Sequence, residues 1–250
     1  MVEKNNLEFS MSAGKRVFKI IRTILIIFIF GFVISLFMYN TTKPQETAKK
    51  VWDSRTTIGD LSSPNHYIMY TDLMCPYCNL FSKVLKQHEA EFKQYLAEHK
   101  ILWEIRPTDF LREYSQHASI YSEWGAEALT CAKRQGRFWD YYYAAIDALD
   151  ATYYQKGVGN SSTAPKISDM TTDFWTNIAK NTNLSPDFYN CFEKHEALEE
   201  MRKTTARVAT ELTPHGGGIP FFKFNSTVFS GIDPNDDWYK IKLRLDQGLK

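Results

Sequence analysis

Two cysteines, Cys75 and Cys78, are separated by two residues in the sequence Cys-Pro-Tyr-Cys. The preceding residues 66–71 (HYIMYT) are rich in aromatic side chains and predict a strand. The following residues 79–99 carry apolar side chains at helical spacing. The pair is therefore expected where a strand meets a helix. There, free N–H groups and the positive end of the helix dipole stabilise a thiolate on the first cysteine.

A Cys-x-x-Cys pair is typical of half a zinc site or of a redox dithiol. Zinc needs two further ligands, and Cys131 and Cys191 stand alone in separate helical stretches, so no metal site is predicted. Pro76 suits the first helical position, where its missing N–H costs nothing. Cys78 is expected one turn into the helix, less exposed than Cys75. Two incidental core cysteines are the alternative to a redox pair.

The rest of the folded part predicts an α/β order of β-α-β, a helical block, then β-β-α. The elements expected after the first helix are a strand over 101–106, mostly helices over 110–212, strands over 221–224 and 227–230, and a last helix carrying Trp238, Ile241, Leu245 and Leu249.

A proline, Pro220, directly precedes the predicted strand over 221–224, in the sequence Gly218-Ile219-Pro220. Proline at the start of a strand is often a plain edge residue. Together with the upstream dithiol, a cis Ile219–Pro220 bond is the second interpretation, because it would present free backbone groups of Ile219 beside the sulfurs. An extended substrate would pair there as an added strand.

The N-terminal part contains an uncharged stretch, Ile24 to Tyr39, which residues 20–23 extend across Arg22. Its length of about 20 apolar residues suits a bilayer. A buried globular helix and a cleaved signal peptide are alternatives, but we favour an uncleaved signal-anchor over 20–39. Lysines and arginines in the flank 1–19 and at position 22 predict a cytoplasmic N-terminus. Residues 40–55 lack hydrophobic periodicity and predict a linker.

The net charge of +1 divides unevenly along the chain. The first 50 residues hold 8 Lys+Arg and 3 Asp+Glu, a balance of +5, which leaves 22 against 26, or −4, for the rest. A mildly acidic folded part argues against nucleic acid as a partner, since phosphate binding needs many unopposed cations. Gly216, Gly217 and Gly218 precede a strand and open no helix, so no phosphate-binding loop and no cofactor are predicted.

Three more residues have two interpretations each. Cys131 and Cys191 form either a disulfide or two buried thiols, and the bridge is favoured because unpaired thiols are a liability outside the membrane. Asp72 lies three residues before Cys75. In the functional interpretation, its carboxyl tunes the thiol pKa or relays a proton. In the structural interpretation, it caps a backbone N–H in a turn.

Residues 58–249 resemble the DsbA-like thiol–disulfide oxidoreductases of the thioredoxin superfamily. The resemblance is carried by three blocks: IGDLSSPNHYIMYTDLMCPYC, ALTCAKRQGRFWDYYYAAI from Ala128, and GGGIPFFKFNSTVFSG. It implies a thioredoxin core (56–107 and 212–250) interrupted by a helical domain (108–211).

At the site, the resemblance implies that Cys75 attacks, Cys78 resolves, and Pro220 is the cis proline, with Pro76, Tyr77 and Ile219 around the dithiol. Ile219 replaces the Val or Thr of many members, so the redox potential is not carried over.

The function expected from these residues is an extracytoplasmic dithiol oxidase that introduces disulfides into exported proteins from a single-pass cell-membrane anchor. The resemblance also implies a quinone-linked membrane partner as reoxidant. A reductase or isomerase on the same fold is the nearest alternative, and a non-catalytic peptide- or metal-binding module is a more distant one.

Overall fold

The computed structural model describes residues 25, 53–114, 120–161, 163–212, 218–225, 227–230, 233 and 236–249. The predicted flank 1–19, the predicted membrane span except Leu25, and the predicted linker up to residue 52 lie outside them. Among the helices of these described ranges, none has the length and apolar character needed to cross a bilayer. Residues Trp52–Lys250 group into one compact unit, to which the following description applies.

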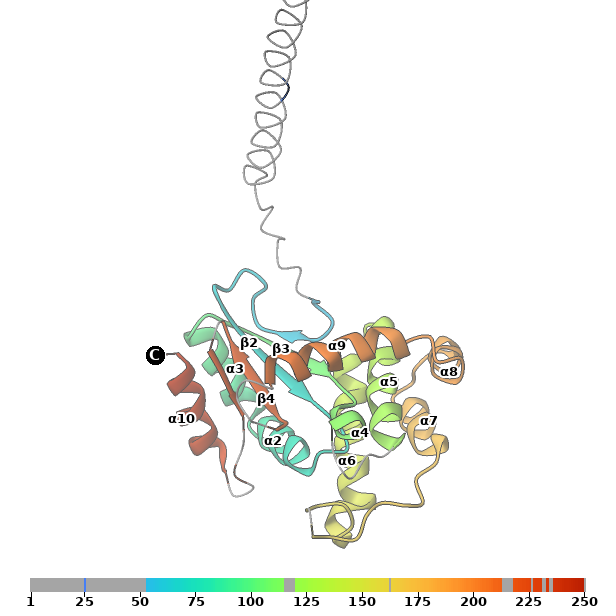
Figure 1. Ribbon diagram of the computed structural model, residues 1–250. Coiled ribbons are helices and arrows are strands. Elements are labelled where there is room, and N and C mark those ends of the chain that lie inside the picture. Colours follow the sequence, from blue (N-terminus) through green and yellow to red (C-terminus); the bar gives the residue numbers. More distant parts are fainter. Residues whose placement is uncertain are drawn as a thin grey trace, which may run out of the picture. The chain divides into compact units, whose positions relative to one another are not determined.

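The described elements follow the predicted order, with helices between the third and fourth strands (Figure 1). In chain order they are β1 (Thr57–Ile58), β2 (Asn65–Thr71), α2 (Pro76–Gln87), α3 (Glu89–Glu98), β3 (Ile101–Pro107), α4 (Phe110–Tyr114), α5 (Ile120–Arg134), α6 (Phe138–Thr152), the 3-10 turn η1 (Tyr154–Lys156), α7 (Thr172–Asn181), α8 (Pro186–Glu193), α9 (Leu198–Leu212), β4 (Phe221–Phe224), β5 (Thr227–Ser230) and α10 (Trp238–Gly248).

The strands form one mixed sheet in the order β1-β3-β2-β4-β5. β2 and β3 are parallel, as a β-α-β unit requires, whereas β4 runs antiparallel to β2 and β5 antiparallel to β4. The short β1, which the sequence analysis did not predict, adds an antiparallel edge beside β3. The central position of β2 matters for function, because its C-terminal end leads directly to Cys75.

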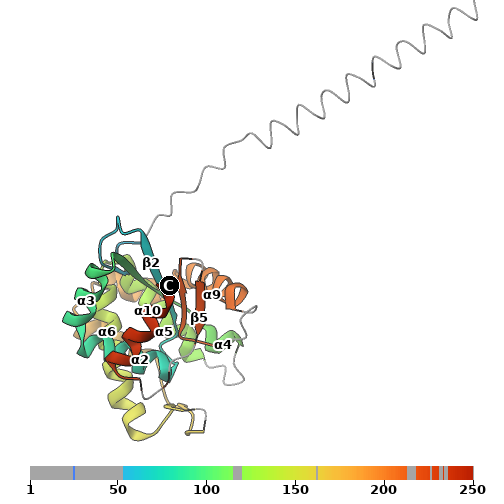
Figure 2. The same cartoon turned by 90° about the vertical axis from the view of Figure 1, so that its left-hand side faces the viewer.

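Each face of the sheet packs against different helices, because successive side chains of a strand point to opposite faces. Tyr67, Trp103 and Phe222 share the face covered by α2, α3 and α10: Trp103 meets Phe92 of α3 edge to face, and Tyr67 Oη donates to Leu245 O of α10 over 2.5 Å. On the other face, Tyr70 Oη lies 3.3 Å from Glu211 of α9. Figure 2 gives the view in which α10 and α9 flank the strands.

Of the helices between β3 and β4, α5, α7 and α8 lie to one side of the sheet in Figure 1, whereas α9 runs back across it. One hydrophobic cluster continues from the sheet into them. α2 joins the two parts, since Lys83 pairs with Asp150 of α6 over 2.6 Å. Asp53, in the predicted linker 40–55, lies 3.7 Å from Lys133 of α5.

The prediction of a single helix over 79–99 is wrong in detail, because two helices occupy this region. The chain breaks at His88, which ends α2 and precedes α3 with φ −112° and ψ 35°. No glycine or proline marks the break, so the periodic apolar pattern ran through it unchanged.

Candidate active site

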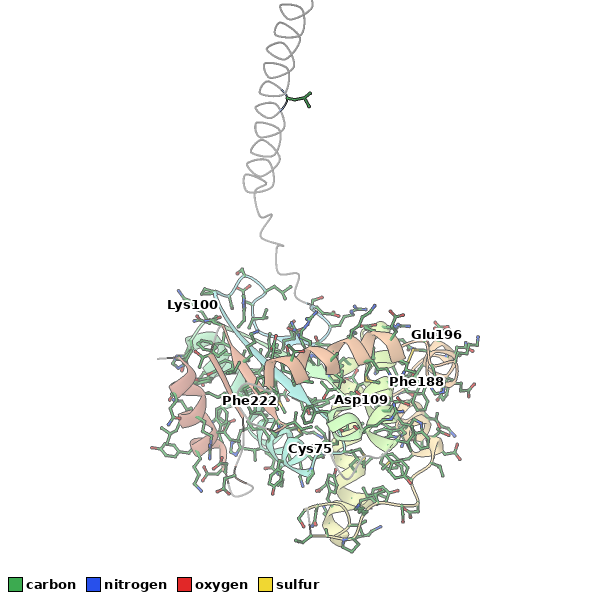
Figure 3. The ribbon with its side chains drawn as sticks, in the orientation of Figure 1. Cys75, Lys100, Asp109, Phe188, Glu196 and Phe222 are labelled. Atoms are coloured by element: carbon green, nitrogen blue, oxygen red, sulfur yellow. A yellow bond between two sulfur atoms is a disulfide. The ribbon has the colours of Figure 1, made fainter. Side chains whose placement is uncertain are left out.

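Cys75 caps the N-terminus of α2, with Pro76 in the first turn (Figure 3). Its extended backbone (φ −85°, ψ 115°) aims the sulfur back over the helix end, where Cys75 Sγ accepts a hydrogen bond from the Cys78 N–H at 3.4 Å. A thiolate at this position meets both a hydrogen-bond donor and the positive end of the helix dipole. The predicted strand–dithiol–helix arrangement is therefore present.

Both sulfurs belong to buried residues. Cys78 is the less exposed of the two, as expected, at 1 % against 3 % for Cys75, but Cys75 is buried as well. The reason is a chain segment far away in sequence, because Cys75 Sγ donates to the carbonyl oxygen of Ile219 at 3.4 Å. Tyr77, between the two cysteines, is 38 % exposed and is the motif residue that reaches solvent.

Ile219 and Pro220 are joined by a cis peptide bond, and both residues are buried. They lie directly before β4, which pairs with β2. The sheet thus brings the end of β2 and the start of β4 together, and with them Cys75 and the Ile219 carbonyl. Both thiols are free in the structure.

The environment of Cys78 opposes its ionisation. Burial raises the pKa of the Cys78 thiol well above its ordinary value, and the hydrogen bond and charge of Cys75 raise it further. The Asp72 backbone and the neighbouring Thr71 side chain act in the opposite direction. The protein therefore keeps Cys78 as a thiol while Cys75 lies at the helix end, which suits Cys75 for the role of the attacking sulfur.

Asp72 is fully buried, and its carboxylate accepts three hydrogen bonds. The donors are the Met74 N–H at 2.9 Å, the Leu111 N–H at 2.9 Å and the Ser122 hydroxyl. Burial raises its pKa to about 6, although these hydrogen bonds lower it. The turn-capping interpretation thus describes the contact with Met74, and the contacts with Leu111 and Ser122 tie the loop before the dithiol to α4 and α5.

Sequence reasoning missed the buried polar residues that surround the dithiol. Asn79 and Tyr154 both donate to the Leu73 carbonyl, at 2.9 Å and 3.2 Å, and so fix the loop that leads to Cys75. Ser82 donates to the Cys78 carbonyl at 2.8 Å and lies 2.5 Å from the Tyr142 hydroxyl. The position of Ser82 beside Cys78 could have been predicted, since Ser82 follows Cys78 by four residues and lies on the same helix face. Tyr142 and Tyr154 carried no such signal.

Cys131 of α5 and Cys191 of α8 form a disulfide with a Cα–Cα distance of 5.8 Å. One helical turn away on each side, Glu127 and His195 pair over 2.9 Å. Burial raises the pKa of Glu127, against the lowering effect of His195. The bridge joins α5 to α8, and the Glu127–His195 contact joins α5 to the turn that follows α8.

Among the residues that the structure describes, no three His, Cys, Asp or Glu side chains lie together in a way that could hold a metal ion. The site itself presents two free thiols, a helix end and a buried carboxyl.

Comparison with solved structures shows the same fold in several bacterial proteins. MdbA from Corynebacterium diphtheriae, a thiol-disulfide oxidoreductase, matches with a TM-score of 0.55 and 14 % identity over 78 % of this chain and 89 % of its own. The alpha-DsbA1 of Wolbachia pipientis matches with a TM-score of 0.52 and 17 % identity, over 77 % and 89 %. Reduced DsbA from Mycobacterium tuberculosis matches with a TM-score of 0.50 and 13 % identity, over 78 % of this chain and 89 % of its own.

A comparison with curated protein sequences gave no match. The family model described as Thioredoxin matches residues 53–240, which include the dithiol, the helical block and the Ile219–Pro220 segment. The predicted fold class, a thioredoxin-like α/β fold with a helical insertion, is confirmed by this match and by the shared fold. The chain therefore belongs to the thioredoxin family, and its Cys75–Cys78 pair lies within the matched residues.

Proposed function

We propose that this protein is an extracytoplasmic dithiol oxidase that introduces disulfides into exported proteins. A substrate thiolate attacks Cys75 Sγ of the oxidised protein, the Cys75–Cys78 bond breaks, and the electron pair leaves on Cys78. A second substrate thiolate then attacks the substrate sulfur of the mixed disulfide and releases Cys75. The substrate gains a disulfide, and the protein ends as the dithiol.

The observation that carries the proposal is the position of Cys75 at the helix N-cap, where its sulfur accepts the Cys78 N–H. Interactions that stabilise a Cys75 thiolate favour the reduced protein, and a protein stabilised in its reduced form is an oxidant. A helix-end interaction contributes about 0.3–2 kcal/mol, and ~1.4 kcal/mol corresponds to ~30 mV for this couple. The helix end thus favours the oxidising direction by an amount of the order of tens of millivolts.

The proposed compartment has two supports. Disulfides persist mainly in oxidising compartments, and Cys131 and Cys191 are bridged. The sequence before residue 40 combines a basic flank with an apolar stretch, which is typical of a signal-anchor with a cytoplasmic N-terminus. An oxidase anchored in this way needs a reoxidant, for which we propose a quinone-linked membrane protein.

Alkylation of the chain in intact cells tests the direction of the reaction. Cells are quenched with acid, free thiols are alkylated with a mass tag, and the state of Cys75 and Cys78 is determined by mass spectrometry. An oxidase is expected to hold most of this pair as the disulfide. A pair found mostly as thiols would contradict the proposal and favour a reductase or isomerase. A Cys131→Ala/Cys191→Ala variant serves as the matched control, because it leaves only the catalytic pair to count.

A further inference from the structure

Three buried hydroxyls lie beside Cys78. Thr71 is the last residue of β2 and shares with Tyr67 and Met69 the sheet face that α2 covers. Ser82 belongs to α2 and Tyr142 to α6. Each of these three residues is 1 % exposed, so bulk water does not reach its hydroxyl.

Of the three hydroxyl groups, two donate their protons to identified acceptors and the third does not. Ser82 gives its proton to the Cys78 carbonyl at 2.8 Å, so at the 2.5 Å Ser82–Tyr142 contact Tyr142 is the donor. The protons of Ser82 and Tyr142 are thus committed. Thr71 Oγ1 is buried and makes no hydrogen bond to any atom in the described part of the chain, and the groups that it faces are Cys78 and the Tyr142 hydroxyl.

An unsatisfied buried hydroxyl destabilises the state in which it is unpaired, so its presence calls for an explanation, and use in another state of the protein is one. The neighbour that changes state is Cys78. Its sulfur becomes a thiolate when a substrate opens the Cys75–Cys78 bond, and again when it attacks a mixed disulfide at Cys75. In both cases the charge forms on a residue that is 1 % exposed.

We propose that the Thr71 hydroxyl is a positioning group that turns its proton toward Cys78 Sγ whenever that sulfur carries negative charge. The inference rests on thiol–disulfide exchange at Cys75 and Cys78, but holds for either direction of the reaction. The lowering effect of the Thr71 side chain on the pKa of Cys78 agrees with it. The other titratable groups around Cys78 are Cys75, Asp72, Tyr142 and Tyr154.

The test follows the second step of a reaction with Ellman's reagent, using the reduced full-length protein and one equivalent of reagent. In the first phase, Cys75 forms a mixed disulfide and releases one thionitrobenzoate. In the second phase, the Cys78 thiolate attacks Cys75 Sγ, the bond to the reagent breaks, and a second thionitrobenzoate leaves with the electron pair. The proton of Cys78 passes to buffer. The second-phase rate is recorded against pH.

Thr71→Val keeps the shape of the side chain and removes the hydroxyl. We expect the second phase to slow about tenfold, with its pH midpoint raised by about one unit, because a hydrogen bond to a charged sulfur is lost. Thr71→Ser is expected to restore the wild-type rate and midpoint. Thr130→Val is the control, since it removes a buried hydroxyl that donates to Ala126 O within α5.

Three outcomes would overturn the inference, and they are distinguishable. If Thr71→Val leaves the second phase and its midpoint unchanged while both phases occur, the role of Thr71 is wrong and dithiol exchange stands. If Thr71→Ser is slower than Thr71→Val, Thr71 acts through packing, because serine leaves a cavity and valine does not. If the reduced wild-type protein releases no thionitrobenzoate, exchange at Cys75 fails, and the inference and the proposed function fail with it.

Discussion

The main-chain N–H of Cys78 points at Cys75 Sγ across 3.4 Å, so the second cysteine helps to stabilise charge on the first. Cys75 has the opposite effect on Cys78: together with burial, it raises the pKa of the Cys78 thiol. This asymmetry supports the proposed division of roles, in which Cys75 attacks and Cys78 resolves.

Cys78→Ser is expected to trap the protein on its substrate. Serine cannot attack the mixed disulfide, so Cys75 stays bonded to a substrate cysteine and multiple turnover falls roughly 100-fold or more. Intact mass under non-reducing conditions measures the adduct. Cys75→Ser is the matched variant and is expected to form none. An equal yield of adduct in both variants would show that the roles are not divided as described.

Asp72 is expected to make stability depend on pH. The pKa of its carboxyl is raised from 3.8 to about 6, so between these values the folded protein holds a proton that the unfolded chain has released. Stability from this group is therefore complete below about pH 4 and is lost as the pH rises through about 6. The loss is on the order of 3 kcal/mol.

Asp72→Asn removes this titration. Urea unfolding of both proteins from pH 4 to pH 7 is the measurement, and the difference in free energy of unfolding between wild type and variant is expected to fall across that range. A constant difference between the two proteins at every pH would contradict a raised pKa at Asp72.

The Cys131–Cys191 bridge closes a loop of 60 residues, and its loss is expected to reduce the free energy of unfolding by ~2–4 kcal/mol. The Cys131→Ala/Cys191→Ala variant, compared with wild type by chemical denaturation, measures this loss. The rate at which Ellman's reagent reacts with Cys75 is expected to be the same in both, since the bridge lies away from the dithiol. Equal denaturation midpoints would mean that the bridge contributes no stability.

Gly125 of α5 has no room for a side chain. A Cβ added there would lie 2.9 Å from the Trp175 ring and 3.3 Å from Leu73, which belongs to the loop before Cys75. Gly125→Ala is therefore expected to destabilise the fold by about 1–3 kcal/mol, although alanine favours helices by up to about 1 kcal/mol. Gly218→Ala is the control, because its Cβ would meet no atom within 4 Å. A Gly125→Ala protein as stable as wild type would contradict this packing.

Local patterns in the sequence predicted the elements that hold the site. The strands at 66–71, 221–224 and 227–230 each have a periodicity or a turn signal, and the structure has them within one residue. The helical region after the dithiol was also predicted, but not its division into α2 and α3 at His88. Short-range physics was sufficient there, because strand alternation and helix-end chemistry act over a few residues.

One long-range contact was predicted: the combination of the dithiol with Pro220 placed the Ile219 backbone beside the sulfurs, and Cys75 Sγ lies 3.4 Å from the Ile219 carbonyl, 144 residues away. The buried state of Asp72 was not predicted, because it depends on Leu111 and Ser122, and these contacts leave no periodic pattern. The same holds for Tyr142, which looks like a packing residue in its aromatic run and nevertheless hydrogen-bonds to Ser82 beside Cys78.

The central claim is tested most directly by mixing oxidised full-length protein with one equivalent of a reduced two-cysteine peptide and counting disulfides by mass. The account predicts that the peptide gains one disulfide while Cys75 and Cys78 become thiols, that Cys131–Cys191 stays bridged, and that Cys75→Ser oxidises no peptide. A peptide that stays reduced, or one oxidised equally well by Cys75→Ser, would contradict it.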